Sequence, residues 1–325
     1  MLGRATAPAG APLVSVIVPA WNAAPFVRQA VHSILSQTLN ELEVIVVDDG
    51  SSDGTANEVR SIRDPRVHVL TQANSGPAAA RNRGVSAAQS PKYVAFLDAD
   101  DFWDPDKLER QVAHLDASPA CGAVGSFLRY VSSSGRVLGV SGHVIGPAEH
   151  AQIARGEFYP FPAMSCLVVR REVLQQAGGF DEPLGRIGSE DLDFMARIAR
   201  VASIETVPEV LGSYRVHPGS AMAMHGSRVS RAARFVRRRL AERDAGRELT
   251  WEAFIASEPV NWTSRRRDAV ERCYRGAALL YGERRTMQAL AYALGALAID
   301  PWYTLRRVYR QRIAPRPATL ARART

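Results

Sequence analysis

The stretch YVAFLDADDFWDPDKLE, from Tyr93 to Glu109, joins an apolar run directly to a series of aspartates. A short apolar run bounded by a turn is typical of a buried strand. Asp104 and Asp106 are explained by a helix that begins beside a proline, where caps and first-turn acids are favourable. Asp98 and Asp100 are not explained in this way. They lie two apart where strand becomes loop, so we predict that their carboxylates converge on a hard cation or a sugar hydroxyl.

Three similar units precede this stretch. LVSVIVPAWN, LEVIVVDDGS and VHVLTQANSG each end an apolar run in a turn, and each is followed by a helical pattern. Near-continuous apolar strands that alternate with helices indicate a parallel sheet covered on both faces, in which ligands bind beyond the carboxyl ends of the strands. The sequence therefore predicts an α/β fold with a Rossmann-like, mostly parallel sheet flanked by helices.

The sequence after this stretch is less regular. CGAVGSFLRYVSSSGRVLGV predicts a hairpin, SEDLDFMARIARVA predicts a helix capped by Ser189, and SIETVPEVLGSYRVH predicts a closing strand. Beyond these segments the chain has helical patterns with arginine-rich faces and a break at Asp300-Pro301. We predict a disordered segment at residues 1–12, a main domain at 13–219 and a helical, arginine-rich region at 220–325.

Charge is distributed unevenly between these regions. Residues 1–219 carry 19 Lys and Arg against 24 Asp and Glu, a net charge of −5, whereas residues 220–325 carry 22 against 9, a net charge of +13. Such asymmetry suggests an anionic partner, either a membrane or a nucleic acid. In YTLRRVYRQRI, Leu305, Val308 and Ile313 fall near one face among arginines, which suits either a membrane interface or packing on the main domain.

The sequence favours a cytoplasmic address. Its longest apolar stretch, Met287 to Ile299, is shorter than the roughly 20 residues that span a bilayer. The first residues lack the apolar core of a signal peptide. Cys121, Cys166 and Cys273 have no metal-ligand spacing and cannot all pair, which fits a reducing compartment. We therefore expect a cytoplasmic protein, or one that is peripheral at the inner face of the membrane.

Two segments before residue 93 contain candidate nucleotide ligands. In VVDDGSSDGT, Asp53 is explained by the start of the next helix, whereas Asp49 could accept a hydrogen bond from a uracil or ribose group. In NSGPAAARNRG, Arg81 is either an exposed helix residue or a residue that faces the phosphates. This segment has neither the dinucleotide-binding fingerprint nor a Walker A motif.

A second acidic cluster follows the segment GGFDE. Glu190 and Asp191 stand at the start of a predicted helix, and separated acidic clusters can divide the work of holding a metal and acting as a base. His217, in YRVHPGS, is more simply a structural residue after a strand. It gains a function if it folds beside Asp100, where its imidazole could bind the same metal.

The segments VSVIVPAWN, VVDDGSSDGT, GPAAARNRG, FLDADD, GGFDE, SED and YRVH follow one another over residues 13–219. In this order they resemble the inverting nucleotide-sugar glycosyltransferases of family 2, which have the GT-A fold. Position 21 is often Tyr in that family and is Trp here. By the resemblance, the residues around the donor nucleotide are Pro19, Trp21, Asp49, Arg81 and Asp98, of which the last meets the ribose.

The resemblance also assigns the metal, the base and a loop. Asp100 matches the metal-binding member of the D-x-D motif, with His217 as a second ligand. Asp191 matches the catalytic base, and Glu190 helps to position the acceptor. Gly178 and Gly179 match a loop near donor and acceptor.

These assignments imply a metal-dependent glycosyltransferase that moves a sugar from a nucleotide-sugar, a UDP-sugar above all, to a hydroxyl of a glycan or lipid-linked acceptor. Synthesis of bacterial cell-envelope polysaccharide is the expected setting, and oxygen ligands favour Mg²⁺ or Mn²⁺. The alternatives are a nucleotidyltransferase and a non-catalytic protein whose basic region binds nucleic acid or membrane. Because that region has no recognisable nucleic-acid motif, we expect no nucleic-acid partner.

Overall fold

The computed structural model describes residues 12–89, 91–157, 164–217, 221–258, 262–282 and 285–308. Residues 1–11 of the predicted disordered segment, and Ile313 of the predicted C-terminal amphipathic pattern, lie outside the described residues. The chain divides into two compact units. The first comprises the residues up to Arg129 and Val140–Tyr214, and the second comprises Tyr130–Gly139 and the residues from Arg215 onward.

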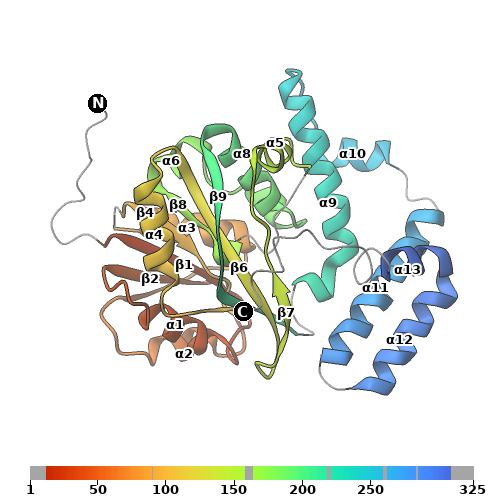
Figure 1. The fold of residues 1–325 in the computed structure, drawn as a ribbon, viewed down its shortest axis with the longest axis horizontal. Helices are drawn as coiled ribbons and strands as arrows, with labels where there is room; N and C mark the ends of the chain where they lie inside the picture. The colour runs from red at the N-terminus through yellow and green to blue at the C-terminus, as the bar shows by residue number, and fades with distance from the viewer. Residues whose placement is uncertain are drawn as a thin grey trace. The chain divides into compact units, whose positions relative to one another are not determined.

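In the described part of the chain, nine strands form one sheet, most of which can be followed in Figure 1. Its strands are β1 (Val14–Ala20), β2 (Leu42–Asp48), β3 (Val67–Thr71), β4 (Tyr93–Phe96), β5 (Phe102–Trp103), β6 (Cys121–Ser132), β7 (Val137–Ser141), β8 (Val168–Arg170) and β9 (Ser203–Val216). The spatial order is β3-β2-β1-β4-β8-β6-β9-β5, and β7 pairs with β6. The four strands predicted from apolar runs are parallel neighbours, which confirms that prediction. β8 pairs antiparallel with both β4 and β6.

Helices cover both faces of this sheet, as the alternating pattern predicted (Figure 1). Along β1 the side chains alternate between faces, so that Val16 and Val18 enter one core cluster and Ile17 enters the other. The first cluster includes side chains of α1 (Val27–Leu35), α2 (Thr55–Arg60) and α4 (Lys107–Ala117). The second includes side chains of α3 (Pro77–Ala87), α5 (Pro147–Ala154), α6 (Arg171–Ala177) and α8 (Glu190–Val201).

Two helix starts differ from the sequence prediction. Ser189 precedes α8, but its φ of 82° is left-handed and its side chain makes no capping bond, because an N-cap needs an extended backbone to aim its oxygen into the first turn. Asp106 pairs with Arg110 and does not cap α4. The Asp104 carboxylate accepts two hydrogen bonds from Arg129, at 2.6 and 2.7 Å. Of these residues, Asp104 thus binds a partner that is distant in the sequence.

The second unit is helical beyond residue 220. Its helices are α9 (Ala221–Asp244), α10 (Trp251–Ser257), α11 (Trp262–Gly282), α12 (Thr286–Ile299) and α13 (Pro301–Val308). The rings of Phe235 and Trp251 pack edge to face with centroids 5.3 Å apart, which joins α9 to α10. The predicted break is confirmed, since Asp300 ends α12 and Pro301 begins α13. Among the described residues, no helix is both long and apolar enough to cross a bilayer.

Candidate active site

The carboxyl ends of three parallel strands meet at one edge of the sheet. Ala20 at the end of β1 pairs with Asp48 at the end of β2, and β4 runs parallel on the other side of β1. Trp21 and Asp49 come directly after the ends of β1 and β2, and Asp98 is the second residue after the end of β4. Ligands of open α/β sheets bind outside such an edge. The predicted clustering of these positions is therefore a property of the fold.

The loop after β1 is held by the loop after β2. The Asn22 N–H donates to Ser51 Oγ and the Ser52 N–H donates to the Asn22 side-chain oxygen, both at 2.9 Å. Asn22 has a left-handed φ of 48°, an uncommon conformation that is often found at functional sites. Trp21 precedes it with an exposed ring. Asp53 accepts hydrogen bonds from loop and helix backbone, as its structural explanation predicted.

Asp49 is buried and organises the turn before α3. One carboxylate oxygen accepts from the Gln72 amide at 2.7 Å and from the Ser75 N–H at 2.9 Å, and the other accepts from the Gly76 N–H at 2.8 Å. A carboxylate has about four acceptor positions, so one more hydrogen bond is possible. Pro19 lies half-buried in β1. The nucleotide contacts of both residues stay predictions.

Arg81 of α3 connects the two acidic clusters. Its Nη2 donates to Asp98 Oδ1 and its Nη1 donates to Glu190 Oε1, each at 2.8 Å. The residue is only 5% exposed, and its guanidinium lies 5.4 Å from the centre of the Phe180 ring. The alternative that Arg81 is an exposed residue of its helix is therefore wrong. One buried cation links α3, the loop after β4 and the start of α8.

The site holds more negative than positive charge. Burial and the neighbouring Asp191 charge raise the pKa of Glu190 to about 7, although Arg81 opposes the shift. Burial also raises the pKa of Asp98, against the pull of Arg81 and with the help of Asp100 and Asp191. Burial acts against the Arg81 charge, yet Asp98 and Glu190 hold the pKa of Arg81 above its ordinary value. Three carboxylates, Asp98, Glu190 and Asp191, thus act on the Arg81 guanidinium, and Asp100 acts on Asp98.

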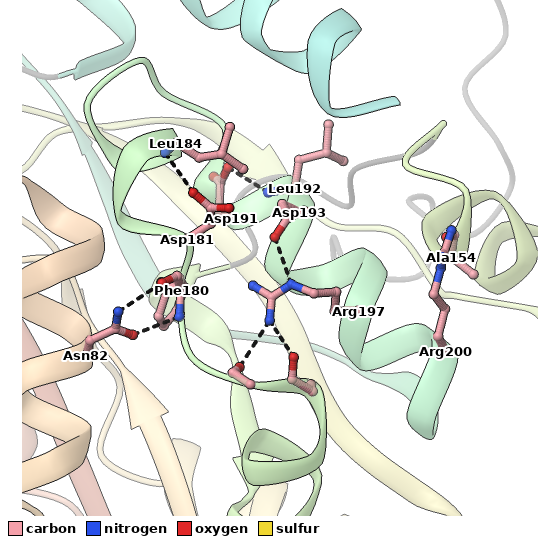
Figure 2. A network of polar contacts seen from close by, with 12 residues as sticks. Asn82, Ala154, Phe180, Asp181, Leu184, Asp191, Leu192, Asp193, Arg197 and Arg200 are labelled. Carbon is pink, nitrogen blue, oxygen red and sulfur yellow. Dashed lines mark hydrogen bonds and ion pairs between the residues drawn. The ribbon is translucent and has the colours of Figure 1, made fainter. Parts of the chain in front are cut away.

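The two acids at the start of α8 have different surroundings. Glu190 is 7% exposed and is bound by Arg81, whereas Asp191 is half-buried. The Asp191 Oδ1 accepts from the Leu192 N–H at 2.8 Å (Figure 2). Of the pair, Asp191 is the acid that an incoming group can approach.

The loop with Gly178 and Gly179 is held from two sides (Figure 2). Arg197 of α8 donates to the Gly178 carbonyl at 3.1 Å. From α3, Asn82 donates to the Phe180 carbonyl at 2.8 Å and accepts from the Phe180 N–H at 2.7 Å. A Cβ on Gly179 would lie 2.7 Å from the Asn82 side-chain oxygen, so a larger residue would have to displace the Asn82 side chain. The loop is therefore fixed to both helices that carry Arg81 and Glu190.

The sequence analysis missed Asn82 and Arg197. A signal for Asn82 was its place beside Arg81 in a segment already singled out, because a helix that carries one site residue often carries its neighbour. Arg197 follows Asp193 by four residues, the spacing of a helical ion pair, and the two side chains do pair at 2.7 Å. Nothing in the sequence indicates its second role, which is to hold the loop of Gly178 through the hydrogen bond to the Gly178 carbonyl.

The predicted metal ligands fall in different units. Asp100 follows β4 in the first unit, and His217 follows β9 in the second, so their joint role stays a prediction. Within the described residues, the three potential ligands whose donor atoms lie within 4.8 Å of one another are His114, Cys121 and Glu205. The His114 ring is hydrogen-bonded to Glu205 at 2.8 Å, and burial raises the pKa of the Cys121 thiol to about 11. This group is explained as a His–Glu pair beside a protonated thiol.

Comparisons with known proteins give the family and the fold of this chain. The sequence model of glycosyl transferase family 2 matches residues 15–178. TuaG of Bacillus subtilis, a glycosyltransferase named for teichuronic acid biosynthesis, is 48% identical over 107 residues, which cover 32% of this chain and 42% of TuaG. The succinoglycan biosynthesis protein ExoO of Rhizobium meliloti is 34% identical over 224 residues, which cover 64% of this chain and 62% of ExoO. The chain thus spans less than two thirds of the length of both relatives.

A solved structure has the same fold. The S. aureus TarS fragment 1–349 in complex with UDP-GlcNAc superposes with a TM-score of 0.57 and 20% identity, covering 92% of this chain and 91% of that one. This likeness confirms the fold that the resemblance implied.

Proposed function

Since this chain belongs to glycosyl transferase family 2, we propose that it transfers a sugar from a UDP-sugar to a hydroxyl group of a glycan or lipid-linked acceptor, with inversion at the anomeric carbon. The observation that carries the proposal is the Arg81 bridge from Asp98 to Glu190. This bridge connects the loop after β4, which we expect to bind the donor, with the start of α8, which we expect to activate the acceptor. Both reacting sides therefore share one edge of the sheet.

The donor side is formed by the loops after β1, β2 and β4. The exposed Trp21 ring offers a flat apolar surface for a nucleobase, and Asp49 has room for one further hydrogen bond. Asp98 is about a third exposed even though Arg81 holds it, so its carboxylate can also accept from a ribose hydroxyl. TarS has this fold and was crystallised with UDP-GlcNAc, which supports a UDP-sugar as the donor.

Asp100 is proposed to hold a divalent cation, with His217 as a second ligand. The excess of carboxylates over the single Arg81 guanidinium fits a doubly charged ion with oxygen ligands, Mg²⁺ or Mn²⁺. When bound, such an ion neutralises the donor diphosphate and stabilises it as a leaving group. Asp98, which accepts a hydrogen bond from Arg81, orients the loop that carries Asp100.

Asp191 is proposed to accept the proton of the acceptor hydroxyl. The hydroxyl oxygen then attacks the sugar C1 from the face opposite the diphosphate, and the bond from C1 to the phosphate oxygen breaks. Glu190 fixes the start of α8 through Arg81 and helps to position the acceptor. The loop of Gly178 and Gly179, clamped by Asn82 and α8, borders both substrates.

The acceptor is proposed to belong to cell-envelope polysaccharide synthesis. TuaG is named for teichuronic acid biosynthesis and ExoO for succinoglycan biosynthesis, which supports an acceptor of this kind. A growing polysaccharide on a lipid carrier would place the enzyme peripherally at the inner face of the membrane. The basic second unit, with its net positive charge, is compatible with that position.

Product analysis tests the proposed function. Incubation with UDP-sugars and a divalent cation should release UDP, through slow donor hydrolysis even without the acceptor. GDP- and dTDP-sugars serve as comparison donors. A nucleotidyltransferase would release pyrophosphate from a nucleoside triphosphate. Pyrophosphate release without UDP formation from any donor would therefore reject the transferase in favour of that alternative.

We expect UDP to stabilise the protein in the presence of Mn²⁺ but much less in EDTA, because the carboxylates of the site repel a bare diphosphate. At a UDP concentration about 100 times Kd, the gain in free energy of unfolding should be about 2.7 kcal/mol. Asp100→Asn should remove most of the difference between Mn²⁺ and EDTA in a thermal-shift assay. Asp116→Asn, which alters an acid that pairs with Lys92 and Tyr93, is the control. Equal stabilisation in EDTA and Mn²⁺ would count against the metal.

The raised pKa of Glu190 makes stability depend on pH in a defined direction. In the folded protein the pKa of Glu190 is about 7, against an ordinary 4.5, so between these values the folded state binds more protons than the unfolded state. The contribution of Glu190 to the free energy of unfolding is therefore at its maximum below pH 4.5. It falls as the pH rises from 4.5 to about 7. Glu190→Gln should remove that fall. Urea unfolding of both proteins at the two ends of the window measures it, and parallel pH profiles would contradict the assignment.

A further inference from the structure

Helix α12 has its small residues inside and its large apolar residues outside. Ala289 and Ala296, seven residues apart, are buried on its inner face. On the opposite face, Met287, Leu290 and Leu294 are 77%, 53% and 55% exposed. Their spacing of three and four residues places these three side chains on one stripe of the helix. We call Met287, Leu290 and Leu294 the outer stripe.

This arrangement is the reverse of a helix on a water-soluble surface. Large aliphatic residues are normally the ones buried, and scattered exposed ones need no explanation, but an aligned row does. From Thr286 to Ile299 the helix has no charged residue at all. Helix α12 packs against α11, where a Cβ on Gly276 would lie 2.5 Å from the Tyr292 ring. The outer stripe is therefore a surface built for contact.

The charged residues of the sequence from Arg285 to Val308 are three arginines and one acid. Arg285 at the start of α12 and Arg306 on α13 are exposed. Asp300 is the one acid in the sequence from Arg285 to Val308, and its Oδ1 accepts from the Tyr303 N–H at 3.0 Å. Helix α13 adds Trp302, which is 80% exposed. Apolar side chains, a tryptophan and an excess of arginines over acids are the composition of a helix that lies at an anionic membrane surface.

We propose that the outer stripe docks onto an anionic lipid bilayer, with α12 lying in the plane of the interface. Fourteen residues of helix are about 21 Å long, too short for the roughly 30 Å hydrocarbon core, which agrees with an in-plane position. A second copy of the chain is the less favourable occupant, because pairing through the stripe would bring the flanking arginines of both copies together. The inference rests on the proposed function in that a lipid-linked acceptor requires a membrane.

Vesicle sedimentation of the full chain tests the proposal with a matched pair of variants. Leu290→Glu/Leu294→Glu changes the stripe, and Thr286→Glu/Gln288→Glu changes two exposed polar positions of the same helix. Both pairs add the same charge, so a difference between them reports apolar insertion and not electrostatics. Vesicles contain phosphatidylcholine alone or mixed with phosphatidylglycerol. Circular dichroism and UDP binding show whether each variant is folded.

The wild type should bind the mixed vesicles, and bind them more weakly as salt is raised. The stripe variant should lose at least about tenfold in binding, whereas the control pair should lose severalfold less. Trp302→Phe should remove part of the vesicle-induced blue shift in tryptophan fluorescence. Equal losses for the two pairs, or no binding by the wild type, would overturn the proposal. If light scattering showed a dimer that the stripe variant loses, the partner of the outer stripe would be a second copy of the chain and not the lipid.

Donor hydrolysis in vesicle-free buffer separates this inference from the proposed function. Vesicle binding without any hydrolysis would reject the transferase and leave the lipid contact in place. Donor hydrolysis by a protein that does not bind vesicles would reject the lipid contact and leave the proposed transferase function in place.

Discussion

Asp191→Asn is expected to lower turnover by about 10²- to 10⁴-fold while donor and metal binding stay nearly normal. Asparagine keeps the size of the side chain and can still accept from the Leu192 N–H, as Asp191 does at 2.8 Å. It cannot take the proton of the acceptor hydroxyl. The loss should therefore appear in kcat, with little change in the KM for the donor. Steady-state kinetics with the identified donor and acceptor measure it.

A structural role for Asp191 predicts a different result. If the carboxylate only favoured the N-terminus of α8, its loss would cost about 0.3 to 1 kcal/mol of stability and leave the turnover of folded protein almost unchanged. Asp116→Asn, an acid of α4 whose partners are Lys92 and Tyr93, controls for loss of one carboxylate. Turnover of folded Asp191→Asn within a few fold of the wild type would reject the base assignment.

Arg81→Met is expected to lower the free energy of unfolding by about 3 kcal/mol, because it leaves buried Glu190 and part-buried Asp98 without their counter-charge. Transfer activity should fall as well, since both carboxylates lose the group that orients them. Urea unfolding measures the first effect. The control is Arg83→Met on the same helix. Because the Arg83 side chain is exposed, this change should alter the free energy of unfolding by less than about 0.5 kcal/mol.

A double-mutant cycle shows whether this loss comes from the bridge. In a Glu190→Gln background, one of the two charges that Arg81 compensates is absent, so Arg81→Met should cost at least about 1 kcal/mol less. Arg81→Lys keeps the charge but cannot place two nitrogens at 2.8 Å from two different carboxylates, so it should rescue stability in part. Strict additivity of Arg81→Met and Glu190→Gln would contradict the bridge.

The sequence by itself determined the strands and the positions of the acids. Apolar runs of strand length that alternate with helices can be satisfied only by a sheet covered on both faces, and parallel pairing brings their carboxyl ends to one edge. Asp49 and Asp98 could therefore be placed at that edge from local pattern alone. The helical start at Glu190 was equally local. These features depend on neighbours within a few residues, which is the range over which periodicity carries information.

Tertiary structure alone decided which of these groups meet. Arg81 binds Asp98 and Glu190 across 17 and 109 residues of sequence, and nothing in the local pattern distinguished this buried arginine from an exposed one. The Ser189 cap was predicted wrongly, because the left-handed backbone before α8 is imposed by the chain around it. The apolar run of α12 was readable as a segment, but periodicity cannot say which face is covered. Packing buried Ala289 and Ala296, and this left Met287, Leu290 and Leu294 exposed.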